Sequence, residues 1–160
     1  MEISALLTVP NIHCDVAVSS KKRAMDVLSA LLVGAGAPLS ESDIFNGLIA
    51  RERLGSTGLG HGIAIPHGRF GTLTQAIAIL VRFAEPVDYD AVDGEPVDLV
   101  VALMVPEQST EEHLQLLAAL AEMFSDAATR HELRQTTTPA GLSAVVEKWS
   151  SAHRQAGQQA

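Results

Sequence analysis

Cysteine and long apolar runs are the features that the sequence most clearly lacks. Cys14 is the only cysteine among 160 residues, so one chain can build neither a disulfide framework nor a zinc site from thiolates. No apolar stretch approaches the ~20 residues that cross a bilayer. The first residues, MEISALLTVPN, lack the positive start and long apolar run of a signal peptide. We therefore expect a cytoplasmic protein that is not embedded in a membrane.

The chain also has few positively charged residues. Lys and Arg number 11 against 19 Asp and Glu, which gives a formal net charge of −8 at pH 7. A surface that binds nucleic-acid phosphates must be basic, so we expect no nucleic-acid partner, whereas an acidic body suits basic protein partners. The length of 160 residues predicts one domain, with a core over about residues 6–150 and a flexible tail over 151–160.

Two helices are predicted in the first third of the chain. Apolar residues recur at helical spacing after Ser20 and end at the stop signals Gly34 and Gly36. A second helix is expected to begin at Ser40, which forms a capping-box pattern with Asp43, and to end near residue 53.

The middle of the chain has the pattern of buried strands. Residues 63–65 are expected to form a short strand within a glycine-rich segment. The runs 76–83 and 97–105 are apolar except for Arg82 and Asp98 and rich in strand formers, as in strands buried on both faces. The segment 88–98 between them is expected to form a loop or hairpin with an Asp-Gly turn.

Helical patterns return after the last of these strands. Ser109 and Thr110 are candidate N-caps of a helix that ends near residue 124 and is apolar on most faces, which predicts that it is well buried. A shorter helix is expected over 127–134 and a last one over 139–152, with Thr138 as its N-cap. Helices that alternate with strands favour an α/β fold with helices on both faces of a small sheet.

The segment GLGHGIAIPHGRF, residues 58–70, holds two of the six histidines. Pro66 pushes Ile65 into extended geometry, so we expect the strand to end there and to hold His67 at its tip. Glycines on both sides leave room for a bulky partner to approach the backbone. A neutral imidazole held in this way can accept a phosphoryl group as a nucleophile. The alternative is a half-exposed histidine in a turn.

Two further residues favour the nucleophile. His113 falls in the first turn of the helix that starts near Thr110, where the helix dipole disfavours a cation, so the imidazole is expected to stay neutral and to donate one hydrogen bond. Arg51 offers charge-assisted hydrogen bonds to phosphate oxygens. Taken singly, a satisfied surface His113 and a solvated Arg51 are the more common interpretations. Together with His67 they would form a phosphoryl site that needs no metal and no cofactor.

Four stretches carry a resemblance to a known family. They are SKKRAMDVLSALL (20–32), RERLGSTGLGHGIAIPHGRF (51–70), PVDLVVALMVP (96–106) and HLQLLAALAEMF (113–124). They resemble the enzyme IIA family of the bacterial phosphotransferase system, and its nitrogen-related branch, IIA-Ntr, more than the mannitol or fructose proteins. The resemblance runs from about residue 6 to 149. It implies a three-layer α/β/α sandwich around a small mixed sheet.

The resemblance also implies roles for the site residues. In that family the histidine of the IPHG stretch is phosphorylated on Nε2, which assigns this role to His67. The second active-site histidine falls on His113 and the arginine on Arg51. The chain departs from the branch at His61, where those proteins carry Asn, and at Arg69, where they carry Lys. We expect His61 to be a tolerated polar replacement and Arg69 to keep a positive charge that meets an acidic or phosphorylated partner.

The expected function is that of a phosphocarrier. His67 would take a phosphoryl group from the phosphohistidine of a small HPr-like donor, the NPr of that family, while Arg51 and His113 stabilise charge. The nitrogen-related branch further implies regulation of targets such as potassium transporters or sensor kinases through the phosphorylation state. Four residues mark the loop and the helix start whose backbone N–H groups are expected to bind phosphate oxygens: Ser56, Thr57, Gly60 and Thr110.

Three other interpretations stay open at this point. A sugar-transport IIA would use the same His67 but pass its phosphoryl group to a IIB cysteine. A metal site would need His61, His67 and His113 with a carboxylate, although no short paired-ligand spacing is present. A pure binding module would keep the fold without the reaction.

Overall fold

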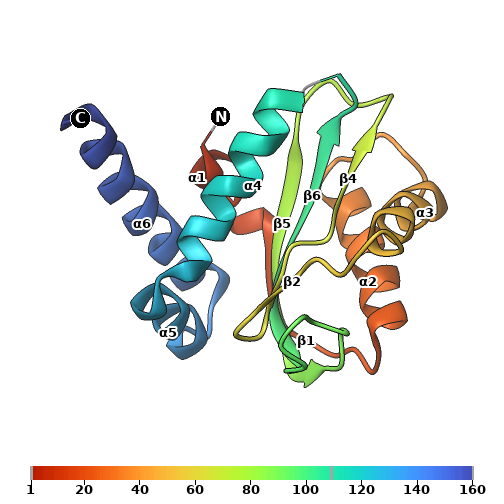
Figure 1. Ribbon diagram of the computed structural model, residues 1–160, viewed down its shortest axis with the longest axis horizontal. Coiled ribbons are helices and arrows are strands. Elements are labelled where there is room, and N and C mark those ends of the chain that lie inside the picture. The colour runs from red at the N-terminus through yellow and green to blue at the C-terminus, as the bar shows by residue number, and fades with distance from the viewer. Residues whose placement is uncertain (1, 109, 160) are drawn as a thin grey trace.

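A mixed sheet runs through the middle of the protein and carries helices on both faces (Figure 1). The structure is a computed structural model, which describes residues 2–108 and 110–159, with side chains through residue 154. Within these ranges the strands are β1 (Ile12–Val16), β2 (Gly58–Gly60), β3 (Ile63–Ala64), β4 (His67–Phe70), β5 (Ile77–Val87) and β6 (Val97–Pro106). The helices are α1 (Ile3–Leu6), α2 (Lys21–Gly34), α3 (Glu41–Glu52), α4 (Thr110–Ser125), α5 (Ala127–Gln135) and α6 (Pro139–Gln159), with a short 3₁₀ turn over Val9–Asn11.

The sheet has the strand order β1-β5-β6-β3-β2, and β4 also pairs with β6. The antiparallel pair β5 and β6 forms its centre, and β1 pairs in parallel with β5. Both β3 and β4 pair in parallel with β6, one after the other along the same edge, and β2 runs antiparallel to β3. The predicted three-layer α/β/α sandwich around a small mixed sheet is confirmed.

The central strands face two separate cores because successive side chains point to opposite sides of a sheet. Leu80 and Leu103 belong to the core under α1, α4, α5 and α6, on the left of the sheet in Figure 1. Ile79 and Val100 belong to the core under α2 and α3, on the right. Both strands are therefore buried on both faces, as their continuous apolar runs predict.

Side-chain hydroxyls cap the helices whose starts the sequence predicts. Ser20 Oγ accepts the N–H of Arg23 at 3.1 Å, and Ser40 Oγ accepts the N–H of Asp43 at 3.1 Å. Thr138 Oγ1 accepts the N–H three residues later at 3.1 Å. Each hydroxyl satisfies one of the backbone donors that a helix start leaves free, so these starts are fixed locally.

Two predictions about the later helices need correction. The prediction that α4 is apolar on most faces and well buried is wrong, because Leu114 is 60% exposed and only a stripe that includes Leu116 and Leu120 is buried. The last helix extends to Gln159 and does not end near residue 152. The expected N-cap at Ser109 lies outside the described residues, and flexibility of the tail stays a prediction.

The first twenty residues contain structure that the sequence patterns did not predict. Ile3, which lies before residue 6, is 3% exposed and belongs to the buried core. Strand β1 pairs with β5, with Ile12 opposite Leu80. Among the described residues, no helix has both the length and the apolar character that crossing a membrane requires.

Candidate functional site

An interrupted strand at the edge of β6 positions His67. Strand β3 ends at Ala64, and β4 begins at His67 on the same neighbour. Between them, Ile65 donates its N–H to the Thr57 carbonyl at 3.0 Å, and the Pro66 carbonyl accepts the N–H of Leu103 at 2.9 Å. The expected strand thus ends just before the proline, but His67 does not lie at a free tip, because a second strand begins with it. Pro66 lacks an N–H but keeps its carbonyl, so the ladder is broken only locally and His67 opens the second segment.

The His67 ring is held by its own backbone. Its Nδ1 lies 2.8 Å from the Ile65 carbonyl oxygen. A carbonyl oxygen can only accept, so Nδ1 carries the proton and Nε2 carries the lone pair. Burial lowers the pKa of His67, and the Arg51 charge lowers it further against the opposing effect of the Ile65 hydrogen bond. The ring is therefore neutral near pH 7.

His113 reaches the same place from α4. Its ring stands edge-on to the His67 ring, with 5.3 Å between centroids and 86° between planes. Arg69 Nε donates a hydrogen bond to His113 Nδ1 at 3.3 Å. The pKa of His113 is lowered to about 4, first by burial and then by His67, Arg69 and Arg51. His113 is thus a neutral imidazole, as its place in the first turn of a helix predicts.

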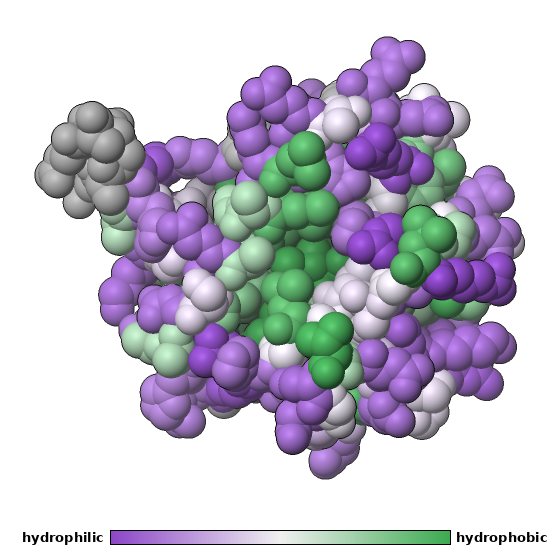
Figure 2. Space-filling model, in the orientation of Figure 1, coloured by the Kyte–Doolittle hydropathy of each residue, from purple (hydrophilic) through white to green (hydrophobic). Residues whose placement is uncertain are grey.

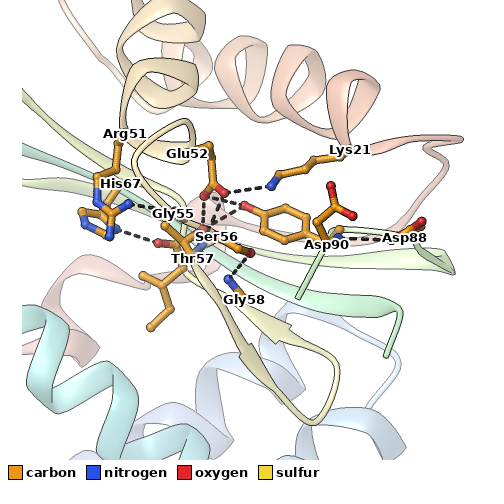
Figure 3. Close-up of polar contacts among 12 residues, drawn as sticks. Lys21, Arg51, Glu52, Gly55, Ser56, Thr57, Gly58, His67, Asp88 and Asp90 are labelled. Carbon is orange, nitrogen blue, oxygen red and sulfur yellow. Dashed lines mark hydrogen bonds and ion pairs between the residues drawn. The ribbon is translucent and has the colours of Figure 1, made fainter. Parts of the chain in front are cut away.

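The last turn of α3 carries Arg51, where a cation is favoured by the helix dipole. Its Nη1 donates to the Gly55 carbonyl at 2.9 Å, and Figure 3 shows the guanidinium beside the His67 ring. This contact leaves most of the guanidinium donors available, because Arg carries five N–H groups. An anion that reached His67 would therefore meet a positive charge already in position.

One cleft of about 470 Å³ brings these side chains together. Six of the ten lining residues are apolar or glycine. Figure 2 shows an apolar strip, hollowed at its centre, on the face of the molecule that Figure 1 presents. His67 itself lines the cleft, and its ring is held through Nδ1 by the Ile65 carbonyl. The cleft is lined by Gly47, Ala50, Arg51, Leu54, His67, Gly68, Arg69, His113, Leu114 and Leu117.

Behind Arg51 lies a buried polar cluster that the sequence patterns did not predict. The Glu52 carboxylate accepts from Lys21 Nζ at 3.0 Å, from Tyr89 OH at 3.0 Å and from both the N–H, at 3.2 Å, and the hydroxyl of Thr57 (Figure 3). Burial and the Glu52 charge raise the pKa of Tyr89, so the phenol stays a donor. One signal was available: Glu52 continues, at a spacing of four residues, the stripe that begins with Ile44 and Leu48 and faces the core.

This cluster corrects the expected phosphate-binding role of Thr57. Its N–H and hydroxyl are already bound to Glu52, it is only 5% exposed, and its carbonyl accepts from Ile65. Ser56 Oγ accepts the N–H of Gly58 at 3.1 Å. The polar groups of Thr57 are therefore satisfied within the protein, and neither Ser56 nor Thr57 is among the described residues that line the cleft.

The other predicted site residues lie away from the cleft or at its margin. Gly60 and His61 line a different cleft, and the His61 N–H donates to Asp93 at 3.0 Å. A metal site that combines His61 with His67 and His113 therefore does not fit, and the described residues contain no group of ligands that could hold a metal. Thr110 opens α4 one turn before His113 and is exposed.

Comparison with known proteins identifies the family. The family model for "Phosphoenolpyruvate-dependent sugar phosphotransferase system, EIIA 2" matches residues 5–149. The chain belongs to this family. A nitrogen regulatory protein of Pseudomonas aeruginosa is 40% identical over 91% of this chain and 95% of its own length. The crystal structure of IIA-Ntr from Neisseria meningitidis superimposes with a TM-score of 0.86 at 43% identity, covering 90% of this chain and 98% of the other.

Membership in the EIIA family makes the chain a component of a phosphotransferase system, and its relatives place it in the nitrogen-regulatory branch. The IIA mannitol protein of Escherichia coli shares the fold, with a TM-score of 0.72 at 21% identity over 86% of this chain and 96% of the other. The family resemblance predicted from the IPHG stretch is thus confirmed.

Proposed function

We propose that this EIIA protein is a phosphocarrier that accepts a phosphoryl group on Nε2 of His67. The observation that carries the proposal is the 2.8 Å contact between His67 Nδ1 and the Ile65 carbonyl. It leaves the lone pair of the neutral ring on Nε2, and the His67 residue lines the cleft. A ring fixed in this tautomer needs no proton transfer before it attacks, since its nucleophilic nitrogen is already free.

The transfer step is an in-line displacement at phosphorus. The lone pair of His67 Nε2 forms the new P–N bond while the P–N bond of the donor phosphohistidine breaks and its electron pair returns to the donor ring. The proton on Nδ1 stays in its hydrogen bond to Ile65 throughout. The protein contributes chiefly orientation and charge stabilisation, because three phosphoryl oxygens carry the negative charge in the transition state.

Three side chains of the cleft supply that stabilisation. Arg51 and Arg69 bring positive charge to the same cleft as His67. His113 lines the same cleft as a neutral imidazole, which can donate a hydrogen bond and adds no charge. Two cations and one neutral donor suit a phosphoryl group, which arrives as a dianion and must be passed on again. A third positive charge would bind it more tightly and oppose its release.

The partner that fits the rim is a small HPr-like protein, the NPr of the nitrogen branch. Leu54 and Leu114 are 83% and 60% exposed at the edge of the cleft. Exposed apolar side chains around a charged centre are typical of protein interfaces. A phosphoryl group adds about −1.5 to −2 charge to this surface, so the phosphorylated and unphosphorylated forms would bind different regulatory targets, such as potassium transporters or sensor kinases.

The test is reconstitution with enzyme I, an HPr-like donor and phosphoenolpyruvate, followed by mass spectrometry of the intact protein. We expect one added phosphoryl group per chain. His67→Ala should remove it, while His113→Ala and Arg51→Ala should slow its formation without unfolding the chain. Normal phosphorylation of His67→Ala would refute the assignment.

A sugar-transport role is the second candidate, because the fold is shared with the IIA mannitol protein. In that case the phosphorylated chain would pass its group to the cysteine of a IIB domain. Incubating the phosphorylated protein with IIB domains separates the two functions. Rapid loss of phosphate to a IIB cysteine indicates sugar transport, and retention of phosphate supports the regulatory role.

A further inference from the structure

In the cleft, Arg69 contacts His113, and this contact bears on how His113 can act during phosphoryl transfer. Arg69 lies two residues after His67 on β4, so both side chains point to the same face of the sheet. From there Arg69 Nε donates to His113 Nδ1 at 3.3 Å, which joins β4 to α4 across the cleft. His113 itself is only 5% exposed.

The chemistry of the two groups fixes the direction of this hydrogen bond. A guanidinium stays protonated and can only donate, so His113 Nδ1 must accept with its lone pair. The neutral ring then carries its single proton on Nε2. His67 is held in the opposite tautomer by a carbonyl oxygen, which can only accept. The cleft therefore holds one imidazole with a free lone pair on Nε2 and one with an N–H on Nε2.

We propose that Arg69 is a positioning residue that holds His113 as the Nε2–H tautomer, so that His113 donates to the phosphoryl oxygens during transfer. This inference rests on the proposed phosphocarrier function. In the other tautomer, the Nε2 lone pair of His113 would face the negatively charged oxygens, and a donor would be replaced by a repulsive contact.

Because His113 is neutral, its tautomer decides which of its two ring nitrogens can donate a hydrogen bond. Its pKa is lowered to about 4, by burial before all other causes. Near pH 7 the ring therefore has one proton to share between two nitrogens, and Arg69 is the side chain that contacts one of them. A lysine at this position would also be a donor that cannot accept, so the inference predicts that Arg69→Lys preserves the tautomer and Arg69→Met does not.

The direct test reads the imidazole nitrogens by long-range ¹H–¹⁵N NMR in the wild type, Arg69→Met and Arg69→Lys. We expect His113 as the Nε2–H tautomer in the wild type and in Arg69→Lys, and a mixture of tautomers in Arg69→Met. His67 serves as the internal reference, because its contact with Ile65 is untouched and its Nδ1–H signature should persist in all three spectra. An unchanged His67 signal also shows that the site is still folded.

Phosphorylation rates complete the test. Arg53→Met is the matched control, because Arg53 is exposed at the C-cap of α3 and its loss removes the same charge without contacting either ring. We expect Arg69→Met to accept phosphate at least about tenfold more slowly, as for loss of a hydrogen bond to a charged group. Arg53→Met should stay within about twofold, because exposed charges contribute little. Arg69→Lys should recover most of the rate.

Two results would overturn the inference: a wild-type tautomer of His113 in Arg69→Met, or a shifted tautomer with a rate no lower than that of Arg53→Met. Failure of the proposed function looks different, because the wild type itself would then take no phosphate on His67. The spectra would still decide, in that case, whether Arg69 controls the tautomer.

Discussion

Removal of the Glu52 carboxylate is expected to destabilise the fold strongly, although the residue never touches the cleft. The side chain is 4% exposed and accepts hydrogen bonds from Lys21, Thr57 and Tyr89. Two of these partners are themselves buried, with Thr57 5% and Tyr89 0% exposed. In Glu52→Ala these donors would face a cavity without an acceptor.

The expected size follows from counting the donors left without a partner. The hydroxyls of Thr57 and Tyr89 lie 2.9 Å apart and can still bond to each other, so one hydroxyl and the Thr57 N–H lose their acceptor. Each buried unsatisfied group costs about 1–3 kcal/mol, and Lys21 is exposed enough to regain water. The two groups together cost about 2–6 kcal/mol, a range that includes the cost of breaking a buried ion pair from one side, about 3–5 kcal/mol. Glu52→Gln keeps one acceptor oxygen and should cost about 2 kcal/mol.

Urea unfolding of wild type, Glu52→Ala and Glu52→Gln measures these free energies. Glu132→Gln is the matched control, since Glu132 pairs with Lys148 at 3.1 Å on the surface, where such a pair contributes about 0.2–1 kcal/mol. We also expect slower phosphorylation in Glu52→Ala, because Thr57 holds Ile65 and Ile65 holds the His67 ring. A loss in Glu52→Ala no larger than in the control would refute the reasoning.

Three further predictions concern the backbone, the packing and the pH. His61→Asn should stabilise the protein by about 0.5–1 kcal/mol, because residue 61 has φ 58 and Asn tolerates this left-handed conformation better; thermal unfolding measures the gain. Gly47→Ala should cost about 1–3 kcal/mol by urea unfolding, because an added Cβ would lie 2.5 Å from the Phe70 ring. Each histidine whose pKa is lowered by folding should reduce the free energy of unfolding by at most about 1 kcal/mol as the pH falls from about 6.5 to 5.5. In this range the unfolded state takes up a proton, whereas folded His113, with its pKa of about 4, stays neutral. His113→Gln should therefore flatten the slope of stability against pH.

Each of these predictions has a control and a contradicting result. His61→Asn should also leave phosphorylation unchanged, and a large loss of rate would show that His61 acts in the reaction. Gly34→Ala is the control for Gly47→Ala, since nothing lies within 4 Å of its added Cβ and Ala favours helix; equal losses at both positions would contradict the packing argument. A pH slope that His113→Gln leaves intact would assign the effect to other groups.

Local signals predicted most of the fold. The hydroxyls of Ser20 and Ser40 mark helix starts through contacts only three residues long. The runs that became β5 and β6 are of strand length, rich in strand formers and almost continuously apolar, which favours strands buried on both faces. Strand β1 was missed because His13 and Asp15 interrupt its apolar pattern. Its pairing with β5, more than sixty residues away, is a tertiary contact.

In the site, too, residues singled out by local signals were predicted, whereas a feature that depends on tertiary contacts was missed. Family resemblance and local chemistry singled out His67, His113 and Arg51, and the fold brings all three to one cleft. Thr57 is unavailable for the role expected of it, because its N–H and hydroxyl bond to Glu52, and its hydroxyl also contacts the buried Tyr89, 32 residues away within a segment expected to be a loop. Spacing along the chain cannot reveal such a contact.

The most direct test of the central claim is the nitrogen that carries phosphorus. Phosphorylated, ¹⁵N-labelled protein examined by ³¹P and long-range ¹H–¹⁵N NMR should show a P–N bond at Nε2 of His67, with Nδ1 still protonated and bonded to Ile65. Phosphorus on Nδ1 of His67, or on any other residue, would contradict the account, because the Ile65 carbonyl would then not be what selects the reacting atom.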